Sequence, residues 1–232
     1  MPPIPSTLRR PWLKICGLRQ PQQAAAVAAL GVEAIGVIAV PSSPRWLAEA
    51  ERSALWEAVA ASAPHALGVL VVADPSDDDL ETLRPAAGHQ VVQLHGGESP
   101  ERCRQLRQAL GPGLGLWKAL RIRGPQDLQQ ALAYAPLVDA LLLDAWVPDQ
   151  LGGTGHRIPV EWLAGFRPPI PWWLAGGIRA DRVAGSLTAL QGSRPDGLDA
   201  SSGVERTPGD KDLAQVEALV AALAGFRQDQ QS

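Results

Sequence analysis

The apolar positions of this chain fall into short continuous runs separated by longer segments of mixed polarity. The run AIGVIAV at 34–40 contains no charged or polar side chain, which is typical of a strand buried on both faces. Runs of this kind, bounded by glycine, proline or polar residues, predict eight strands. The predicted strands lie at 12–16, 34–40, 66–72, 90–94, 114–122, 138–144, 171–175 and 197–200.

The segments between these runs have the composition and the start signals of helices. Pro21 and Pro100 stand where a first helical residue is expected, and Ser99 precedes Pro100 as a candidate N-cap. An acidic stretch at 77–83 is also predicted to be a short helix. The predicted helices lie at 21–30, 48–61, 77–83, 100–110, 126–134, 160–166, 180–190 and 211–224.

Eight alternations of strand and helix predict an α/β protein with a single (β/α)8 TIM barrel. The length of 232 residues suits this fold, which needs about 200 to 250 residues. A doubly wound open sheet is the alternative, but no Gly-x-Gly-x-x-Gly sequence follows the first strand. We therefore expect one domain over 1–232, with a flexible leader at 1–11 and a mostly polar tail at 225–232.

Composition narrows the cellular setting and the partners. The net charge of −3 indicates no nucleic-acid partner, and no apolar run approaches the ~18 residues of a membrane span. The proline-rich first residues lack the apolar core of a secretory signal, and two cysteines form no disulfide framework. These features favour a cytoplasmic protein that binds neither nucleic acid nor membrane.

Lys14 and Cys16 stand on the same face of the first predicted strand, because side chains alternate along a strand. A cation beside a thiol favours the thiolate, so Cys16 is a candidate for chemistry. On these residues alone, a buried structural cysteine is an equal alternative. Cys103, by contrast, falls in helical register with Leu106 and Leu110 and is expected to be a core residue.

Further polar residues follow other strands at the end where TIM barrels carry their chemistry. Arg45 follows the second strand, His95 the fourth, Asp144 ends the sixth and Asp199 lies in the eighth. Singly, each could be a solvated loop residue or a helix cap. Their common placement with Cys16 predicts one active site at this end of the barrel.

Two glycine-bearing segments predict a bound phosphate. The loops after strands seven and eight form the recurrent phosphate site of this fold. Here they contain Gly176 and Gly177, then Ser202 and Gly203, whose backbone N–H groups are free of bulky side chains. The expected partner is a phosphorylated small molecule. No His or Cys spacing indicates a metal site, so we expect a cofactor-free acid/base enzyme.

The chain resembles the phosphoribosylanthranilate isomerase family of tryptophan biosynthesis over residues 12–224. The matching segments occur in the family's order: KICGL at 14–18, AIGV at 34–37, SPR at 43–45, VQLHG at 92–96, LLD at 142–144, GGTG at 152–155, LAGG at 174–177, DASSGVE at 199–205 and PGDKD at 208–212.

The resemblance implies an Amadori rearrangement of N-(5-phosphoribosyl)anthranilate to 1-(2-carboxyphenylamino)-1-deoxyribulose 5-phosphate. By position, Asp144 would be the general acid that opens the furanose ring, and Cys16 the general base that removes the C2 proton. Arg45 would hold the anthranilate carboxylate, and Asp199 the ribose hydroxyls, with His95 also in the substrate site. The same resemblance implies that Gly176, Gly177, Ser202 and Gly203 hold the phosphate.

Three positions depart from the family pattern, and two other functions stay open. The departures are Ala39, Ser42 and Gly97, which bear on the packing of the anthranilate pocket. A related isomerase of histidine synthesis, or one of dual specificity, would carry an aspartate in place of Cys16. A non-catalytic phosphosugar-binding barrel would explain the glycines but not Cys16, Asp144 and Arg45. The sequence leaves monomer or homodimer undecided.

Overall fold

The computed structural model describes residues 10–84, 88–145 and 157–225, and these form the predicted barrel. Eight parallel strands close in chain order, with the last strand paired to the first. The strands are β1 (Trp12–Cys16), β2 (Ala34–Ile38), β3 (Leu67–Val72), β4 (Val91–Leu94), β5 (Gly115–Ile122), β6 (Ala140–Ala145), β7 (Trp172–Ala175) and β8 (Gly197–Ala200).

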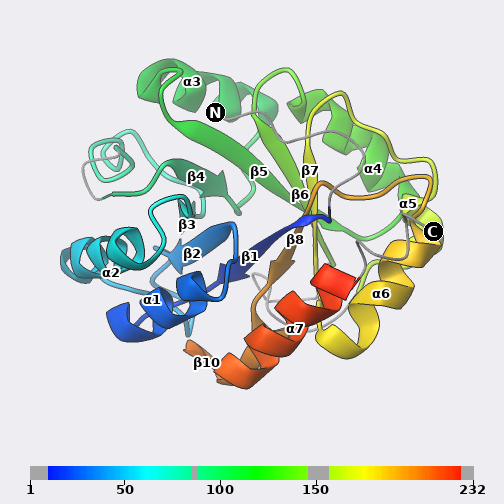
Figure 1. The fold of residues 1–232 in the computed structure, drawn as a ribbon. Coiled ribbons are helices and arrows are strands. Elements are labelled where there is room, and N and C mark those ends of the chain that lie inside the picture. Colours follow the sequence, from blue (N-terminus) through cyan, green and yellow to red (C-terminus); the bar gives the residue numbers. More distant parts are fainter. Residues whose placement is uncertain (1–9, 85–87, 146–156, 226–232) are drawn as a thin grey trace.

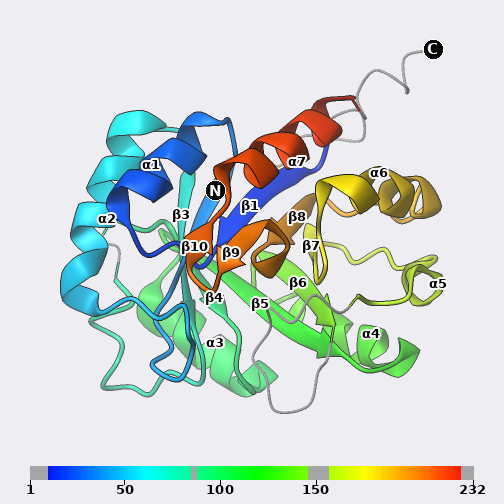
Figure 2. The same ribbon diagram turned by 90° about the horizontal axis from the view of Figure 1, so that it is seen from below.

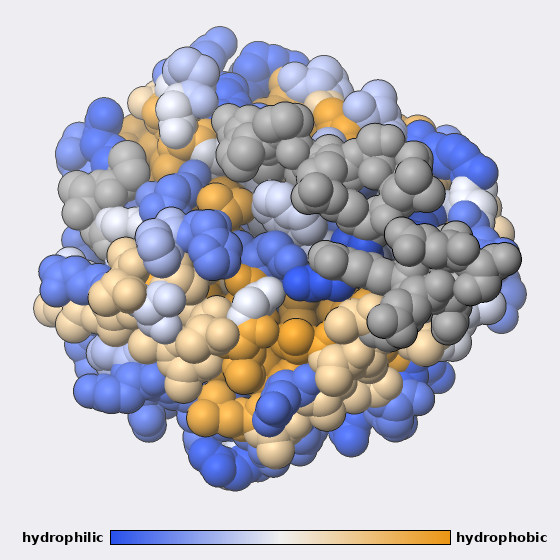
Figure 3. All heavy atoms as spheres, in the orientation of Figure 1, coloured by the Kyte–Doolittle hydropathy of each residue, from blue (hydrophilic) through white to orange (hydrophobic). Residues whose placement is uncertain are grey.

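Helices surround this barrel on its outer side (Figures 1 and 2). They are α1 (Pro21–Ala29), α2 (Glu49–Ser62), α3 (Pro100–Leu110), α4 (Pro125–Ala131), α5 (Val160–Leu163), α6 (Ala180–Ala189) and α7 (Leu213–Gly225). The helix α1 packs between α2 and α7, and α6 packs on α7. In the space-filling view, hydrophilic side chains dominate the outline of the molecule, as expected for helices with one buried face (Figure 3).

The prediction of a helix at 77–83 is wrong, because this stretch forms successive turns. The backbone N–H of Thr82 donates to the carbonyl of Asp79 three residues earlier, at 3.0 Å, and not to one four residues earlier. The Asp79 carboxylate accepts from both the backbone N–H and the hydroxyl of Ser76. The hydroxyl of Thr82 also donates to the carbonyl of Asp79 at 2.8 Å. Threonine hydroxyls that bond nearby backbone carbonyls compete with an α-helix, which favours turns in this stretch.

Smaller differences concern the ends of elements. The helix predicted at 126–134 is α4 followed by one 3₁₀ turn at Leu132–Tyr134, and the one predicted at 160–166 is the single turn α5. A two-stranded antiparallel hairpin, β9 (Glu205–Thr207) and β10 (Asp210–Lys211), was not predicted. The GGTG segment at 152–155 lies outside the described residues, as do most of the expected leader and tail.

Tryptophans fill the interior of the barrel toward the N-terminal ends of the strands. The rings of Trp117 and Trp173 stack with centroids 4.7 Å apart, and Trp12 meets Trp173 edge-on. Gly197 makes room for this layer, since a Cβ there would lie 2.2 Å from Cε3 of Trp173. The interior is therefore packed at that end, and space for a ligand remains at the opposite end of the strands.

Candidate active site

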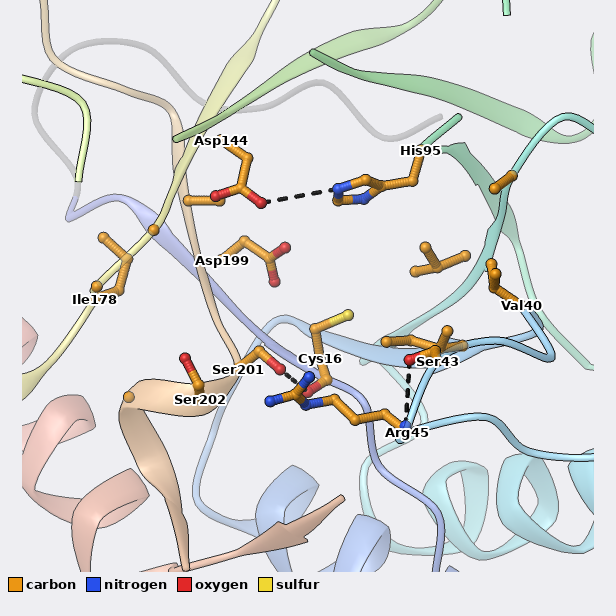
Figure 4. Close-up of a pocket in the computed structure, with 17 residues that line it drawn as sticks. Cys16, Val40, Ser43, Arg45, His95, Asp144, Ile178, Asp199, Ser201 and Ser202 are labelled. Carbon is orange, nitrogen blue, oxygen red and sulfur yellow. Dashed lines mark hydrogen bonds and ion pairs between the residues drawn. The ribbon is translucent and has the colours of Figure 1, made fainter. Parts of the chain in front are cut away.

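One pocket at the C-terminal ends of the strands contains every site residue expected from the sequence. Its lining includes Cys16, Arg45, His95, Asp144, Gly176, Gly177, Asp199, Ser202 and Gly203. These residues come from strands of the barrel and the loops that follow them, and the close-up shows the polar side chains arranged around a common space (Figure 4). The three departures, Ala39, Ser42 and Gly97, are not among the lining residues.

Lys14 and Asp199 form a buried ion pair below the thiol of Cys16. The ammonium of Lys14 is fully buried and lies 3.0 Å from Oδ1 of Asp199. Burial lowers the pKa of Lys14, but the neighbouring Asp199 and Cys16 raise it, so that it lies above its ordinary value. Lys14 therefore keeps its positive charge beside the sulfur.

The thiol of Cys16 has a pKa above its ordinary value. Burial raises this pKa most, the charge of Lys14 lowers it, and the charge of Asp199 raises it again. The expected influence of Lys14 on the thiolate is present, but it is outweighed by desolvation. The close packing of sulfur and lysine depends on Gly36, where a Cβ would lie 2.8 Å from Sγ of Cys16 and 3.0 Å from Cε of Lys14.

The carboxyl group of Asp144 has the pKa of a group that exchanges protons near neutral pH. Burial, followed by the negative charge of Asp199, raises the pKa of Asp144 to about 7. The side chain is only 8% exposed, which accounts for the large effect of desolvation. A carboxyl group in this state can donate a proton to a bound substrate.

His95 faces Asp144 as a neutral imidazole. Burial and the charges of Lys14 and Lys118 lower the pKa of His95 to about 3. Nε2 of His95 lies 3.8 Å from Oδ2 of Asp144, too far for a hydrogen bond, and the ring is uncharged, so the contact is no ion pair. On the other side of the ring, Nδ1 lies 3.0 Å from Nε2 of Gln93. If that amide nitrogen donates, the proton of His95 is on Nε2 and points toward Asp144.

Arg45 enters the pocket from the loop after β2 and is already paired with Glu205. Its Nε lies 3.0 and 3.1 Å from the two carboxylate oxygens of Glu205, and its Nη2 lies 2.7 Å from Oε2. Figure 4 shows its side chain reaching below Cys16 toward Ser201. Glu205 was not predicted as a partner of Arg45, although it lies in one of the segments that carry the family resemblance.

The glycines after β7 have backbone conformations that other residues rarely adopt. Gly176 and Gly177 have φ angles of 87° and 65°. Gly203 allows close contact between the two loops, since a Cβ there would lie 2.2 Å from the carbonyl oxygen of Ile178. The loops after β7 and β8 are thus packed together, and their small residues leave backbone groups accessible to a ligand.

Two residues that were not singled out from the sequence, Gln93 and Arg121, lie next to site residues but do not line the pocket. Gln93 lies on β4, two residues before His95, which directly follows the strand. Strand alternation therefore places the two side chains on the same face. Arg121 pairs in register with Asp144 on the neighbouring strand.

Cys103 is fully buried in the hydrophobic core, as expected, and burial raises its pKa to about 11.

Within the described residues, no group of three or more His, Cys, Asp or Glu side chains is arranged to hold a metal ion. Over the same residues, no helix is long and apolar enough to cross a membrane.

Comparison with known proteins identifies the family. The family model described as N-(5'phosphoribosyl)anthranilate (PRA) isomerase matches residues 13–222. The chain belongs to this family. The N-(5'-phosphoribosyl)anthranilate isomerase of Trichormus variabilis is 46% identical over 211 residues, which cover 91% of this chain and 97% of that protein. The phosphoribosyl anthranilate isomerase family thus accounts for nearly the whole chain, and the isomerase activity in tryptophan biosynthesis expected from the sequence is confirmed.

Solved structures of the phosphoribosyl anthranilate isomerase family have the same barrel. The enzyme from Thermus thermophilus superposes with a TM-score of 0.77 at 33% identity, covering 93% of this chain and 99% of its own. Another, at 24% identity and a TM-score of 0.73 with the same coverage, was solved in complex with reduced 1-(o-carboxyphenylamino)-1-deoxyribulose 5-phosphate. At 24% identity, the similarity to this second structure shows a shared fold only.

Proposed function

We propose that Asp144 and Cys16 carry out the isomerisation of N-(5'-phosphoribosyl)anthranilate as general acid and general base. The observation that carries this proposal is the raised pKa of Asp144, about 7, in a pocket that it shares with the buried thiol. The reaction moves protons and oxidises one sugar carbon while reducing its neighbour. One acid and one base therefore suffice, and we expect no cofactor.

The proposed reaction begins when Asp144 protonates the furanose ring oxygen. The bond from C1 to that oxygen breaks, and the nitrogen lone pair forms a C=N bond, which gives an open-chain protonated Schiff base. The Cys16 thiolate then removes the proton from C2, and the electron pair moves through C1 to the nitrogen. The resulting enolamine loses its hydroxyl proton and gains a proton on C1 to become the ketone. Substrate and product are isomers, so the atoms balance.

Three further roles follow from the same pocket. Arg45 is proposed to bind the anthranilate carboxylate, a task suited to the forked guanidinium. Asp199, with His95 beside the acid, is proposed to contact the sugar hydroxyls. Gly176, Gly177, Ser202 and Gly203 are proposed to hold the phosphate, as the corresponding loops do in many barrels of this fold. These roles describe a soluble phosphorylated substrate, and we propose a cytoplasmic enzyme that acts as a monomer or homodimer.

The protonation states set the pH dependence of this mechanism. The active pair needs a protonated Asp144 and a Cys16 thiolate, so it carries one proton in total. The pair holds one proton at pH values between the pKa of Asp144, about 7, and the raised pKa of the thiol. Below that pH range both groups are protonated, and above it neither is. The value of kcat/KM should therefore rise with pH near 7 and fall at alkaline pH, with limbs that belong to the coupled pair.

Replacement of each proposed group tests the proposal, with loss of anthranilate fluorescence as the assay. Cys16→Ala should lower kcat by about 10²- to 10⁴-fold while product binding is largely retained. Asp144→Asn should remove turnover at every pH, because an amide cannot deliver the ring-opening proton. Cys103→Ala is the matched thiol control and should keep near-normal activity. If Cys16→Ala keeps more than about half of the wild-type rate, Cys16 is not the base.

A further inference from the structure

Two contacts hold the side chain of Arg45, one from the end of β1 and one from the hairpin of β9 and β10. Its aliphatic stem lies against Gly17, where a Cβ would come within 2.6 Å of Cδ of Arg45. Its guanidinium is held by the carboxylate of Glu205 through Nε and Nη2. The exposed fractions of the two side chains are 9% and 4%, so solvent does little to screen this pair. Such a geometry leaves Arg45 few other rotamers.

Glu205 is also bonded to groups of its own hairpin. Nζ of Lys211 lies 2.6 Å from Oε1 of Glu205, and the backbone N–H of Gly209 donates to the same oxygen at 3.1 Å. The pKa of Glu205 is lowered despite its burial, because Arg45 and Lys211 stabilise the charged form. Glu205 is therefore a fixed carboxylate with all of its partners in place.

The same hairpin is connected to the end of β1 that bears the proposed base. Lys211 is fully buried, and its Nζ lies 3.4 Å from the carbonyl oxygen of Ser201. The hydroxyl of Ser201 donates to the backbone carbonyl of Cys16 at 3.0 Å. Through Lys211, Glu205 is thus connected to the loop after β8, whose Ser201 in turn contacts the backbone of Cys16.

The pairing with Glu205 uses only part of the guanidinium. Arginine has five N–H donors, and Glu205 engages the edge formed by Nε and Nη2. Nη1 of Arg45 has no hydrogen bond to any residue in the described parts of the chain, and Arg45 lines the pocket. The edge formed by Nη1 and the second N–H of Nη2 is therefore free for a carboxylate of the ligand. Arg45, Glu205 and Lys211 together carry one net positive charge, which a ligand carboxylate would neutralise.

We propose that Glu205 is a positioning residue that holds Arg45 so that its free edge faces the carboxylate of the substrate. This inference rests on the proposed role of Arg45 and assigns to Glu205 a share of the specificity for a substrate that bears a carboxylate. Glu205 contacts neither the reacting carbons nor the carboxylate in this mechanism. Its effect on binding of the carboxylate is transmitted through the guanidinium of Arg45.

The test compares two ligands that differ only in that carboxylate. The first is reduced 1-(o-carboxyphenylamino)-1-deoxyribulose 5-phosphate, and the second is the same compound with a phenyl ring in place of the carboxyphenyl ring. Titration calorimetry gives the ratio of their affinities, which measures the contribution of the carboxylate. The variants are Glu205→Gln, Arg45→Ala, the double variant, and Arg206→Gln as a control, since Arg206 is an exposed residue of the same hairpin.

Glu205→Gln should lower the affinity ratio at least about tenfold, with a higher KM and a nearly unchanged kcat, because a charge-assisted hydrogen bond is no longer correctly aimed. The double variant should have the ratio of Arg45→Ala alone, because Glu205 acts only through Arg45. Arg206→Gln should keep the wild-type ratio. If Glu205→Gln gives no folded protein, Glu205→Asp replaces it, since its shorter side chain cannot span both nitrogens.

The outcomes separate this inference from the proposed function. If Arg45→Ala lowers the ratio and Glu205→Gln does not, Arg45 binds the carboxylate and the positioning role of Glu205 is wrong. An equal loss of affinity for both ligands in Glu205→Gln, or additive losses in the double variant, also overturns the role. If Arg45→Ala leaves the ratio unchanged, the carboxylate binds elsewhere, and both the role of Arg45 and that of Glu205 are rejected.

Discussion

The ammonium of Lys14 lies 3.0 Å from the carboxylate of Asp199, on neighbouring strands that join the two ends of the barrel sheet. The two residues are partners in strand register, so closure of the barrel itself produces the contact. The pair lies next to both proposed catalytic groups. Asp199 raises the pKa of Asp144 and of Cys16, and Lys14 lowers both. Burial raises both pKa values most, and the balance between these two charges shifts the proton affinities of the acid and the base together.

Removal of the negative charge of this pair should shift the pH profile. Asp199→Asn removes a charge that raises the pKa of Asp144, so the acidic limb of kcat/KM should move from near 7 to lower pH. The rate will also fall, because Asp199 is proposed to contact the sugar, but the position of the limb is independent of that loss. The measurement is kcat/KM from about pH 5 to about pH 10 for both proteins, a range that spans both limbs. Asp181→Asn, at an exposed helical position, is the control.

An acidic limb of Asp199→Asn that stays near pH 7, or moves upward, would contradict this account. The limb would then belong to a group other than Asp144, or desolvation alone would set its pKa.

Asp144→Asn should make the protein more stable above neutral pH while it abolishes activity. The pKa of Asp144 is 3.8 in the unfolded chain and about 7 in the folded protein, so the folded state disfavours the charged form. This costs the wild type up to about 4 kcal/mol of unfolding free energy at pH 8. The cost is absent below about pH 3.8, where both states bind the proton, and it grows as pH rises to 7. Asparagine removes it.

Urea unfolding of the wild type and of Asp144→Asn at several pH values between about 4 and about 8 checks this prediction. The difference in unfolding free energy should increase with pH and level off above the folded pKa of about 7. A difference that stays constant with pH would show that folding does not raise the pKa of Asp144.

Arg45→Lys should weaken binding of the anthranilate part of the substrate. The ammonium keeps the charge but cannot engage Glu205 and a ligand carboxylate along two separate edges. We expect KM to rise by about tenfold or more, the effect of one lost charge-assisted hydrogen bond. Steady-state kinetics measures it. An unchanged KM would place the carboxylate site elsewhere in the pocket.

The sequence predicted the barrel because each strand is a local, continuous apolar run, as at 34–40. It also placed the nine candidate site residues at one end of the barrel, where they line one pocket, since parallel strands bring their C-terminal ends together. It failed at 77–83, where the hydroxyl of Thr82 bonds to the carbonyl of Asp79 and the chain forms turns. It could not give the partners of Arg45, because the contact with Glu205 joins residues separated by 160 positions. Nor could it give the net pKa of the thiol, which depends on how far burial outweighs the charge of Lys14.

Gly36 provides the last prediction, because the packing of Cys16 against Lys14 depends on the absence of a side chain there. Its φ angle is not in the left-handed region, so alanine is tolerated by the backbone and the effect is one of space alone. A Cβ at 2.8 Å from Sγ of Cys16 and 3.1 Å from its Cα must displace the sulfur or the strand. Gly36→Ala should therefore lower kcat and cost about 1 to 3 kcal/mol of unfolding free energy, as overpacking does.

Gly185→Ala is the matched control for this substitution. Gly185 lies in α6, and a Cβ added there would meet no atom within 4 Å beyond the backbone of its own helix. Alanine should stabilise that helix by about 0.5 to 1 kcal/mol without changing kcat. Activity assays and urea unfolding of both variants give the comparison. If Gly36→Ala keeps full activity and full stability, the sulfur is free to move away from Lys14, and the ammonium is not needed near the thiol during catalysis.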